Sequence, residues 1–421
     1  MDNILNKYFF VLFSLIPISI ILGPSISLSN ILLIDFSFIF LLLYKKEYKF
    51  LSNRTVKLIL LFFLYLIFNS IISKDFYIGA LRNFGFIRFG ILFCAFNYFF
   101  YNKDFFKKIF IIWSFTLFVL VIDVYIESFT GRNILGYGEL YGNRIVSFFK
   151  DEPIVGGYIN AFYLIIIGYL FSLNFKSSKN YRYFILMIAL FLILAVLLTG
   201  ERSSAIRTII GFLFFYFIGN TFKIKEKLIS IFLLFVIISS LINNIDYLKV
   251  RYKDQFINPI VLLYKSNFTK IDNESNLIKN TTRRSEYYYL YRSAFIVFKN
   301  HPFFGVGNKN YRIETCGLEK NPKYLCHTHP HQTYFELLSE HGLVGTVIIL
   351  FILFNLIFGK LKIIIESNNY IQIGCFSLLL SMLIPFLPSG AFFGDGVSTI
   401  FWINLSLMYS INKRTNIFSE N

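Results

Sequence analysis

Long apolar runs separated by short polar connections extend along the whole chain. A helix needs about 20 apolar residues to cross a hydrocarbon core about 30 Å thick, and runs near that length recur throughout. The pattern predicts an all-α integral membrane protein with about twelve transmembrane helices. The expected spans are 8–29, 31–44, 56–73, 84–101, 109–126, 155–173, 183–199, 205–219, 228–243, 337–358, 370–388 and 398–412, of which the second and the eighth are short.

The composition agrees with this interpretation and excludes a soluble globular domain. The chain has 421 residues, of which 56% are hydrophobic and 15% charged, with a mean hydropathy of +0.61. A soluble domain carries about 25% charged residues. The net charge of +17 does not indicate nucleic-acid binding, because the basic residues form short clusters between apolar runs and no basic groove or aromatic-interleaved patch.

Basic clusters occupy alternate connections and set the topology. They contain Lys45, Lys46, Lys49, Arg54 and Lys57; Lys103, Lys107 and Lys108; Lys176, Lys179 and Arg182; Lys223, Lys225 and Lys227; Lys360 and Lys362; and Lys413 and Arg414. The positive-inside rule places these connections and both termini in the cytoplasm. The first run is too long for a signal-peptide core and lacks a small-residue cleavage site, so we expect it to stay attached.

Three parts are therefore expected. Residues 1–243 hold transmembrane helices 1–9, residues 244–336 form a large outer loop with partly helical structure, and residues 337–421 hold helices 10–12 and a cytoplasmic tail. Within the loop, the amphipathic stretch Tyr287–Phe298 is predicted to be helical. Long connections are usually functional, which directs attention to this loop.

The cysteines suggest how the end of the loop is held. Cys316 and Cys326 share the outer loop, where an oxidising compartment favours a disulfide between them. So short a ring stabilises a loop by about 2–3 kcal/mol. Cys94 and Cys375 fall inside spans and are interpreted as apolar packing residues.

Several charged residues fall near the outer ends of spans. Ends of spans are where charge is tolerated, and Asp35 and Asp123 fit that structural explanation. Arg88, Arg202 and Arg207 form a group that is harder to explain in this way. The planar guanidinium binds phosphate through two hydrogen bonds and keeps its charge when desolvated. Together these arginines favour a lipid-phosphate or pyrophosphate site.

Four of the five histidines lie between Cys326 and Gly345. His327, His329 and His331 alternate, so in an extended chain they share one face, and a zinc site is an alternative there. Neither a helical histidine pair nor a CxxC spacing supports it, and we expect no metal.

Histidine also carries protons near neutral pH. Pro330 keeps His329 out of helical geometry, so a helix is expected to begin near His331, where free amides favour a bound anion. His331 is therefore the candidate base, and His341 fits a structural role.

At this point the sequence resembles a known family. His331-Gln332, nine residues and then Gly342-Leu343-Val344-Gly345 are similar to the signature of O-antigen ligases, with His329 and Glu336 as further matching positions. The segments "HPFFGVGNKNYR" (301–312), "TGERSS" (199–204) and "LIPFLPSGAFF" (383–393) resemble three other blocks of that family.

The resemblance implies a metal-independent glycosyltransferase at the periplasmic face of the bacterial inner membrane, without a cofactor. It implies transfer of a glycan from undecaprenyl pyrophosphate to an acceptor hydroxyl, usually on lipid A-core, and a single displacement would invert the anomeric configuration. His331 would be the general base and Arg202 a phosphate-binding residue, with Arg312 as a further candidate.

The chain departs from the family pattern in two places. Gln332 replaces the commoner asparagine, and Tyr287 stands where an arginine is often found; Arg283, Arg284 and Arg292 lie nearby.

Alternatives remain open at this stage. The same superfamily includes O-antigen polymerases and protein O-oligosaccharyltransferases, so the motif does not define the acceptor. A transporter or flippase for the same lipid-linked glycan would share the spans and the arginines, but midplane charges and internal repeats are not seen. An assembly protein with a zinc-stapled loop is a third class. No Walker, Rossmann or EF-hand pattern occurs.

Overall fold

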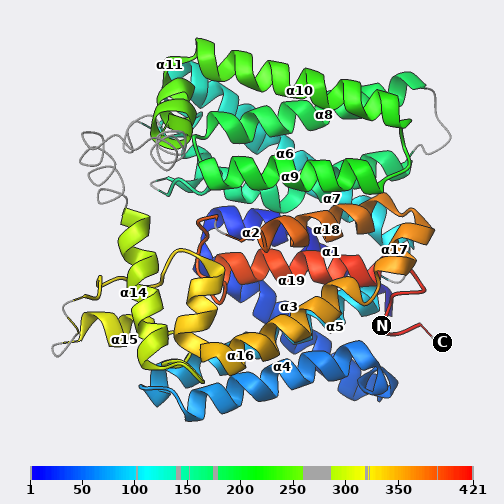
Figure 1. Cartoon of the computed structure of the whole chain (residues 1–421). Coiled ribbons are helices and arrows are strands. Elements are labelled where there is room, and N and C mark those ends of the chain that lie inside the picture. Colours follow the sequence, from blue (N-terminus) through cyan, green and yellow to red (C-terminus); the bar gives the residue numbers. More distant parts are fainter. Residues whose placement is uncertain are drawn as a thin grey trace, which may run out of the picture.

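The structure is a computed structural model that describes residues 2–100, 103–138, 144–150, 152–173, 179–258, 286–317, 321, 323–385 and 387–419. Within these ranges all regular elements are helices (Figure 1). The principal helices are α1 (Asp2–Ser14), α2 (Ile16–Leu22), α3 (Pro24–Lys45), α4 (Arg54–Ile71), α5 (Phe76–Phe99), α6 (Lys103–Thr130), α7 (Val155–Leu173), α8 (Lys179–Leu198), α9 (Arg202–Ile218), α10 (Ile224–Asn244), α14 (Glu286–Asn300), α15 (Tyr311–Cys316), α16 (Thr333–Phe358), α17 (Leu361–Ser367), α18 (Tyr370–Met382) and α19 (Asp395–Ser410). Short elements are η1 (Lys49–Ser52), η2 (Ser147–Phe149), α11 (Asp246–Leu248) and the π-helical η3 (Lys249–Ile257).

The described helices form a multi-pass membrane bundle. Eight of them are long and apolar enough to cross a membrane, and the bent pair α1–α2, with 44° between its parts, makes a ninth. Helices α9, α18 and α19 are shorter, with 17, 13 and 16 residues, yet they run alongside the long helices in Figure 1. The all-helical membrane fold is confirmed, whereas a count of twelve spans is not.

The first boundary between helices was placed wrongly. The expected span 8–29 runs through Gly23, where the structure ends α2 and begins α3. Gly23 has φ 123°, a conformation that only glycine adopts easily, and Pro24 occupies the first turn of α3, where its missing N–H is tolerated. Because the apolar run continues across this turn, only the Gly-Pro pair marks the break.

Helix α7 lies at the centre of the bundle. Of its most apolar window 83% is buried, against 11% for α10, which lies at the periphery. Glycines allow α7 and α18 to approach closely: a Cβ on Gly168 would meet the Tyr370 carbonyl at 2.5 Å. Gly374 on α18 is equally close to the backbone of Leu164. Small residues at helix crossings are the usual means of tight packing in membranes.

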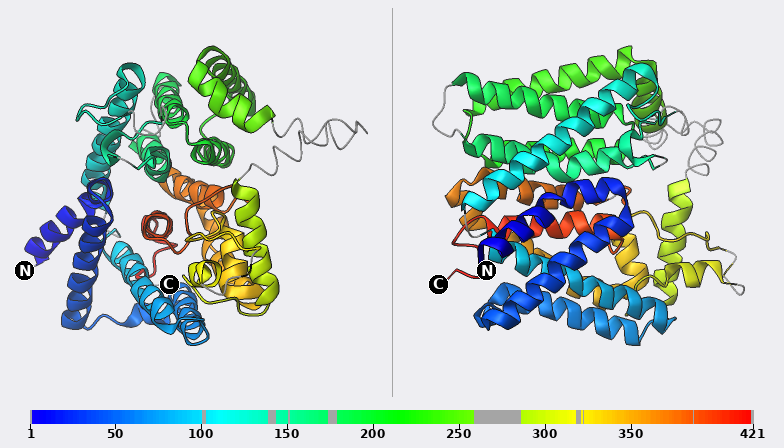
Figure 2. Two further views of the ribbon diagram at one scale, coloured as in Figure 1. Left: turned by 90° about the vertical axis from the view of Figure 1, so that its left-hand side faces the viewer. Right: turned by 180° about the vertical axis from the view of Figure 1, so that it is seen from behind.

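The loop helices and the chain ends occupy opposite ends of the bundle. Figures 1 and 2 show α11, α14 and α15 at one end, and both marked termini at the other. Helix α14 confirms the helix predicted at Tyr287–Phe298 and packs beside the first turns of α16. A cluster of buried apolar residues links α14, α15 and the following loop: Ala294, Val297, Val306, Tyr311 and Tyr324.

Candidate active site

His331 lies immediately before the first turn of α16. The helix begins at Thr333, two residues later than expected, with Gln332 as N-cap; its side-chain oxygen accepts a hydrogen bond from Phe335 N at 2.8 Å. The amide of the motif therefore has a defined structural role, since N-caps satisfy free backbone donors. His331 itself has φ 56°. Positive φ is uncommon outside glycine and occurs at functional sites, where surrounding contacts hold it.

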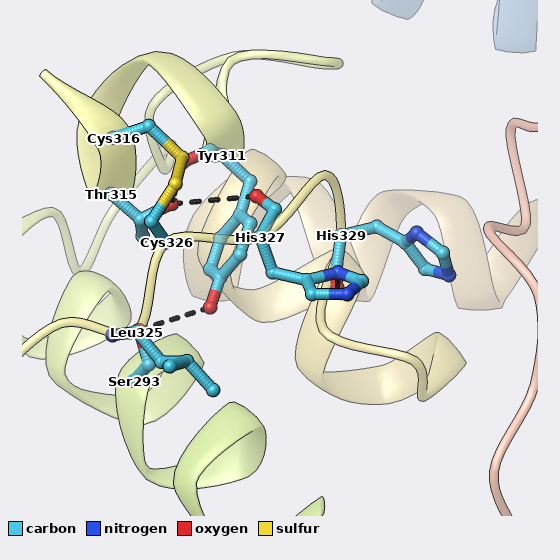
Figure 3. The surroundings of a disulfide bond; sticks show 8 residues. All are labelled: Ser293, Tyr311, Thr315, Cys316, Leu325, Cys326, His327 and His329. Carbon is cyan, nitrogen blue, oxygen red and sulfur yellow. Dashed lines mark hydrogen bonds between the residues drawn. A yellow bond between two sulfur atoms is a disulfide. The ribbon is translucent and has the colours of Figure 1, made fainter. Parts of the chain in front are cut away.

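The disulfide fixes the start of the histidine segment. Cys316, at the end of α15, is bonded to Cys326, with 4.7 Å between their Cα atoms. Figure 3 shows the next two histidine rings, those of His327 and His329, pointing away from the sulfur atoms. On the same loop, Leu325 N donates a hydrogen bond to the hydroxyl of Ser293 on α14 at 3.1 Å and anchors the segment to that helix.

Three imidazole rings meet in this segment. The ring centroids of His329 and His331 are 4.0 Å apart, those of His327 and His331 4.6 Å, and those of His327 and His329 5.9 Å. Burial, followed by the charges of His331 and His327, lowers the pKa of His329 to about 3. Lys309 lowers this pKa further, and the backbone of Ser389 acts in the opposite direction. His329 is therefore a neutral imidazole at physiological pH.

The two glycine-containing motif blocks bind each other through their backbones. Gly342 has φ 63° and ψ −170°, which breaks α16. The amides that follow the break, Leu343 N and Val344 N, donate to the carbonyls of Pro302 and Phe303 at 2.8 and 3.0 Å. The blocks therefore hold the outer loop against the first turns of α16.

The remaining glycines and His341 have structural roles. A Cβ on Gly345 would collide with the hydroxyl of Tyr65, and one on Gly305 would collide with the backbone at Glu340. His341 is fully buried, and its Nδ1 lies 3.1 Å from the hydroxyl of Tyr65. The structural interpretation of His341 agrees with this placement.

Glu336 and His331 both hold the segment between α18 and α19. The buried Glu336 carboxylate accepts hydrogen bonds from Phe392 N at 2.7 Å and Phe393 N at 3.4 Å. The carbonyl of His331 accepts one from Ser389 N at 2.9 Å. The hydroxyls of Thr333 and Ser389 lie 3.1 Å apart. The "LIPFLPSGAFF" block thus packs directly on the start of α16.

A cavity of about 690 Å³ opens beside this contact. Thr333 and Ser389 line it, together with apolar side chains of α2, α3 and α19. Its charged lining residues are Arg88, Lys150, Glu152, Glu201, Arg207 and Asp395. A pocket with mostly apolar walls and a few charged groups is typical of a binding site for an amphipathic molecule.

Arg207 is the best placed of the predicted arginines. It lines the cavity, and its Nη2 donates to the carbonyl of Pro388 at 2.9 Å. Its Nε is buried without a hydrogen-bond partner, and no carboxylate within the described ranges forms an ion pair with it. The adjacent residue, Ser389, binds the backbone of His331. Arg207 and His331 therefore contact consecutive residues of one segment.

Arg88 also lines the cavity, but a carboxylate neutralises it. Its guanidinium pairs with Asp395, which also binds Arg82 at 3.0 Å. Asp395 is not predictable from the sequence pattern, because it lies 307 residues from Arg88 in the chain. Lys150, in the connection before α7, is a further lining cation that the sequence pattern does not predict.

Arg202 and Arg312 lie outside the cavity lining. Arg202 donates to the carbonyl of Gln255 in η3 at 2.8 Å, and Arg312 is exposed on α15. Glu201, between α8 and α9, accepts hydrogen bonds from the first amides of α7, Gly156 N and Gly157 N, at 2.7 and 3.1 Å. Arg202 and Arg207 are about one and a half turns apart on α9, yet only Arg207 lines the cavity.

The position where the family often has an arginine faces the candidate base. Tyr287, on α14, has its ring centroid 6.4 Å from that of His331, with the planes near perpendicular. Arg292 is exposed on the same helix, and Arg283 and Arg284 lie outside the described residues. An aromatic side chain therefore occupies this position beside His331.

Comparison with known proteins agrees with this arrangement of motifs. A protein-family model described as O-antigen ligase matches residues 186–350, which run from α8 through the outer loop to the first half of α16. A search of curated proteins found no match to the chain. The matched segment contains Arg202, Arg207 and His331, and the match supports the resemblance of this part of the chain to the O-antigen ligase family.

Proposed function

We propose that this protein is a periplasmic-face glycosyltransferase of the bacterial inner membrane. It moves a glycan from undecaprenyl pyrophosphate to an acceptor hydroxyl, and the expected reaction is ligation of O-antigen to lipid A-core. The family match supports a ligase or polymerase of this superfamily. The observation that carries the finer proposal is that the Arg207 guanidinium donates to the carbonyl of Pro388 while Ser389 N donates to the backbone carbonyl of His331. Arg207 and Ser389 line the cavity, and His331 lies next to that lining.

The cavity suits both ends of the donor. Its apolar lining from α2 and α3, which includes Ile20, Leu22 and Ile31, offers a surface for the isoprenoid chain. Arg207 offers its guanidinium to the pyrophosphate, since no carboxylate of the described residues pairs with it, and the planar fork of arginine matches phosphate oxygens. Arg88 and the more distant Arg202 and Arg312 contribute positive potential, and Asp395 reduces the contribution of Arg88.

His331 supplies the base in this scheme. A nitrogen of its ring takes the proton of the acceptor hydroxyl while that oxygen attacks the anomeric carbon. The bond from the anomeric carbon to the pyrophosphate oxygen breaks, and its electron pair leaves with the pyrophosphate. Arginine charge stabilises that leaving group without a metal ion, and a single displacement inverts the anomeric configuration. General-base catalysis contributes about 10²–10⁴-fold, and orientation in the cavity adds to it.

The proposal is tested with surface glycolipid from a strain that lacks this gene. Complementation uses the wild type, His331→Ala or the control His301→Ala, which removes a partly exposed histidine that contacts Glu314. Loss of ligation leaves bare core and long polymer retained on the carrier lipid. The wild type and His301→Ala should restore ligation, and His331→Ala should not. Core bearing one repeat unit would identify a polymerase. Full rescue by His331→Ala would remove the histidine from the mechanism.

A further inference from the structure

The histidine segment contains a second chemical feature that proton transfer does not use. His327, His329 and His331 each place a ring nitrogen so that all three atoms lie within 4.8 Å of one another. Three imidazoles around one point are the donor set of zinc sites that keep a fourth position open, with Zn–N distances of about 2.0–2.1 Å. Tetrahedral geometry then separates the nitrogens by about 3.3 Å, which small rotations of the side chains can reach.

The backbone explains why the rings converge. Between the disulfide at Cys326 and the N-cap Gln332 the chain bends at Thr328 and His329, and this brings the rings of His327 and His329 to 5.9 Å between their centroids. The left-handed conformation of His331 turns the third ring toward them. Both ends of the segment are fixed, so the three side chains are held together before any ligand arrives.

The Nδ1 atoms of His327 and His329 already make the kind of contact that orients metal-binding histidines. His327 Nδ1 lies 3.2 Å from the carbonyl oxygen of His329, and His329 Nδ1 lies 3.2 Å from the hydroxyl of Thr328. A ligand histidine ordinarily uses one nitrogen for such a contact, which fixes its tautomer and leaves the other nitrogen for the metal. Here the remaining nitrogen of each ring is Nε2.

His329 provides an independent indication of a missing ligand. Its Nε2 is buried and makes no hydrogen bond of good geometry within the described residues, although the backbone of Ser389 is close enough to the ring to raise its pKa. Buried polar atoms are nearly always satisfied, so each exception needs an explanation. A metal ion bound at this nitrogen would supply the missing partner.

We propose that His327, His329 and His331 form a site for a divalent transition metal of the Zn²⁺ type. Imidazole donors suit zinc, copper, nickel and cobalt, whereas Mg²⁺ and Ca²⁺ prefer oxygen. The neighbouring Lys309 opposes a bound cation, which favours reversible rather than permanent occupancy. Occupancy uses the lone pair of His331, so metal binding inhibits glycan transfer; this consequence rests on the proposed function.

Binding is tested on the full-length protein in detergent, purified through an affinity tag without histidine and stripped with a chelator. Zn²⁺ is titrated against a chromophoric competitor, and Co²⁺ absorption in the visible range reports the geometry. Wild type should bind one ion per chain. His327→Ala and His329→Ala should bind at least about 10-fold more weakly, since even outer-shell changes cost about 10–100-fold. His327→Gln serves as a second variant if His327→Ala folds poorly.

His301→Ala is the matched control, because His301 lies outside the cluster and contacts Glu314. It should bind Zn²⁺ as the wild type does. Equal affinity in the wild type and in the His327 and His329 variants would overturn the proposal, and so would equal weakening by His301→Ala.

The inhibitory consequence is measured separately as glycan transfer in membranes with added Zn²⁺. The wild type should lose activity and recover it with chelator, and His327→Ala should need at least about 10-fold more Zn²⁺ for the same fractional loss. Zn²⁺ binding at the three histidines without loss of transfer would leave the metal site intact and contradict the role of His331 as base. Absence of binding would remove the metal site and leave the proposed function untouched.

Discussion

His331 combines a rarely used backbone conformation with a defined set of contacts. Its φ of 56° is held by Ser389 on one side and by the N-cap Gln332 on the other. Residues strained in this way persist only where the surroundings determine them. The contacts therefore fix the backbone of His331 beside Ser389, a lining residue of the cavity, before any substrate binds. A base that acts on a positioned hydroxyl is expected to be held in this way.

Arg207 should dominate the charge interaction with the donor. Removing a charged hydrogen-bond partner costs about 1.5–3 kcal/mol, so Arg207→Ala should lower kcat/KM for the lipid-linked donor by about 10–100-fold. Arg202→Ala should lower it less, because that side chain donates to Gln255 outside the cavity. The check is initial rates at several donor concentrations in membranes. A larger loss with Arg202→Ala would contradict the assignment.

Glu314 should make the contact of the outer loop with the bundle sensitive to acid. Burial alone raises the pKa of this carboxyl, but hydrogen bonds from Lys74 and Tyr324 and the charge of Lys74 hold it below its ordinary value of 4.5. A depressed pKa means that the ion pair, at 2.7 Å, contributes fully above pH 4.5 and is lost as the pH falls through the lower value.

Glu314→Gln should therefore lower the stability of the docked α15 by about 1 kcal/mol at pH 7 and by almost nothing in acid. The effect at pH 7 is small because Lys74 is half exposed. Hydrogen exchange of α15 at pH 7 and at low pH, corrected for the intrinsic exchange rate, measures the difference. An equal effect of the substitution at both pH values would show that the pair is not the cause.

At the scale of elements, the glycines of the motif determine how the outer loop docks on α16. Gly342 lies in a region of φ and ψ that only glycine populates, and a Cβ there would collide with the carbonyl carbon of Phe303. The kink exposes amides that bind the chain at Pro302 and Phe303. The spacing of the GxxG motif thus allows backbone pairing between α16 and the loop.

Gly342→Ala should destabilise the protein by about 1–3 kcal/mol, the cost of a strained backbone, and more where the collision is not relieved. The midpoint of thermal unfolding in detergent should fall accordingly. Gly396→Ala is the control, because a Cβ at this helical position has open space within 4 Å. Its midpoint should stay the same or rise. Equal midpoints for the two variants would contradict the proposed role of the kink.

Sequence periodicity predicted local features well. The amphipathic pattern of Tyr287–Phe298 and the helix that follows His331 are local properties, and α14 and α16 confirm both within two residues. The pairing of Arg88 with Asp395 depends on how α5 and α19 pack against each other, and the hydrophobic periodicity of the sequence does not predict helix packing. The same holds for the contact of Arg207 with Pro388, which joins residues 181 apart. These long-range contacts decide which arginines remain available in the cavity.

At the scale of the whole molecule, both chain ends lie opposite the outer loop (Figure 2). Together with the basic connections, this arrangement predicts cytoplasmic termini and a periplasmic histidine segment. A fluorescent protein fused after residue 419 should fluoresce, and alkaline phosphatase fused there should be inactive. Phosphatase inserted into the connection between η3 and α14 should be active. The reverse pattern would place the histidines in the cytoplasm and contradict the proposed site of transfer.

The most direct test of the account is the rate of glycan transfer by purified protein in liposomes, compared between wild type and His331→Ala. We expect a loss of about 10²–10⁴-fold, the contribution of a general base, with little change in binding of the lipid-linked donor. The control His301→Ala should retain the wild-type rate. A His331→Ala rate within a few-fold of the wild type would show that another group takes the proton.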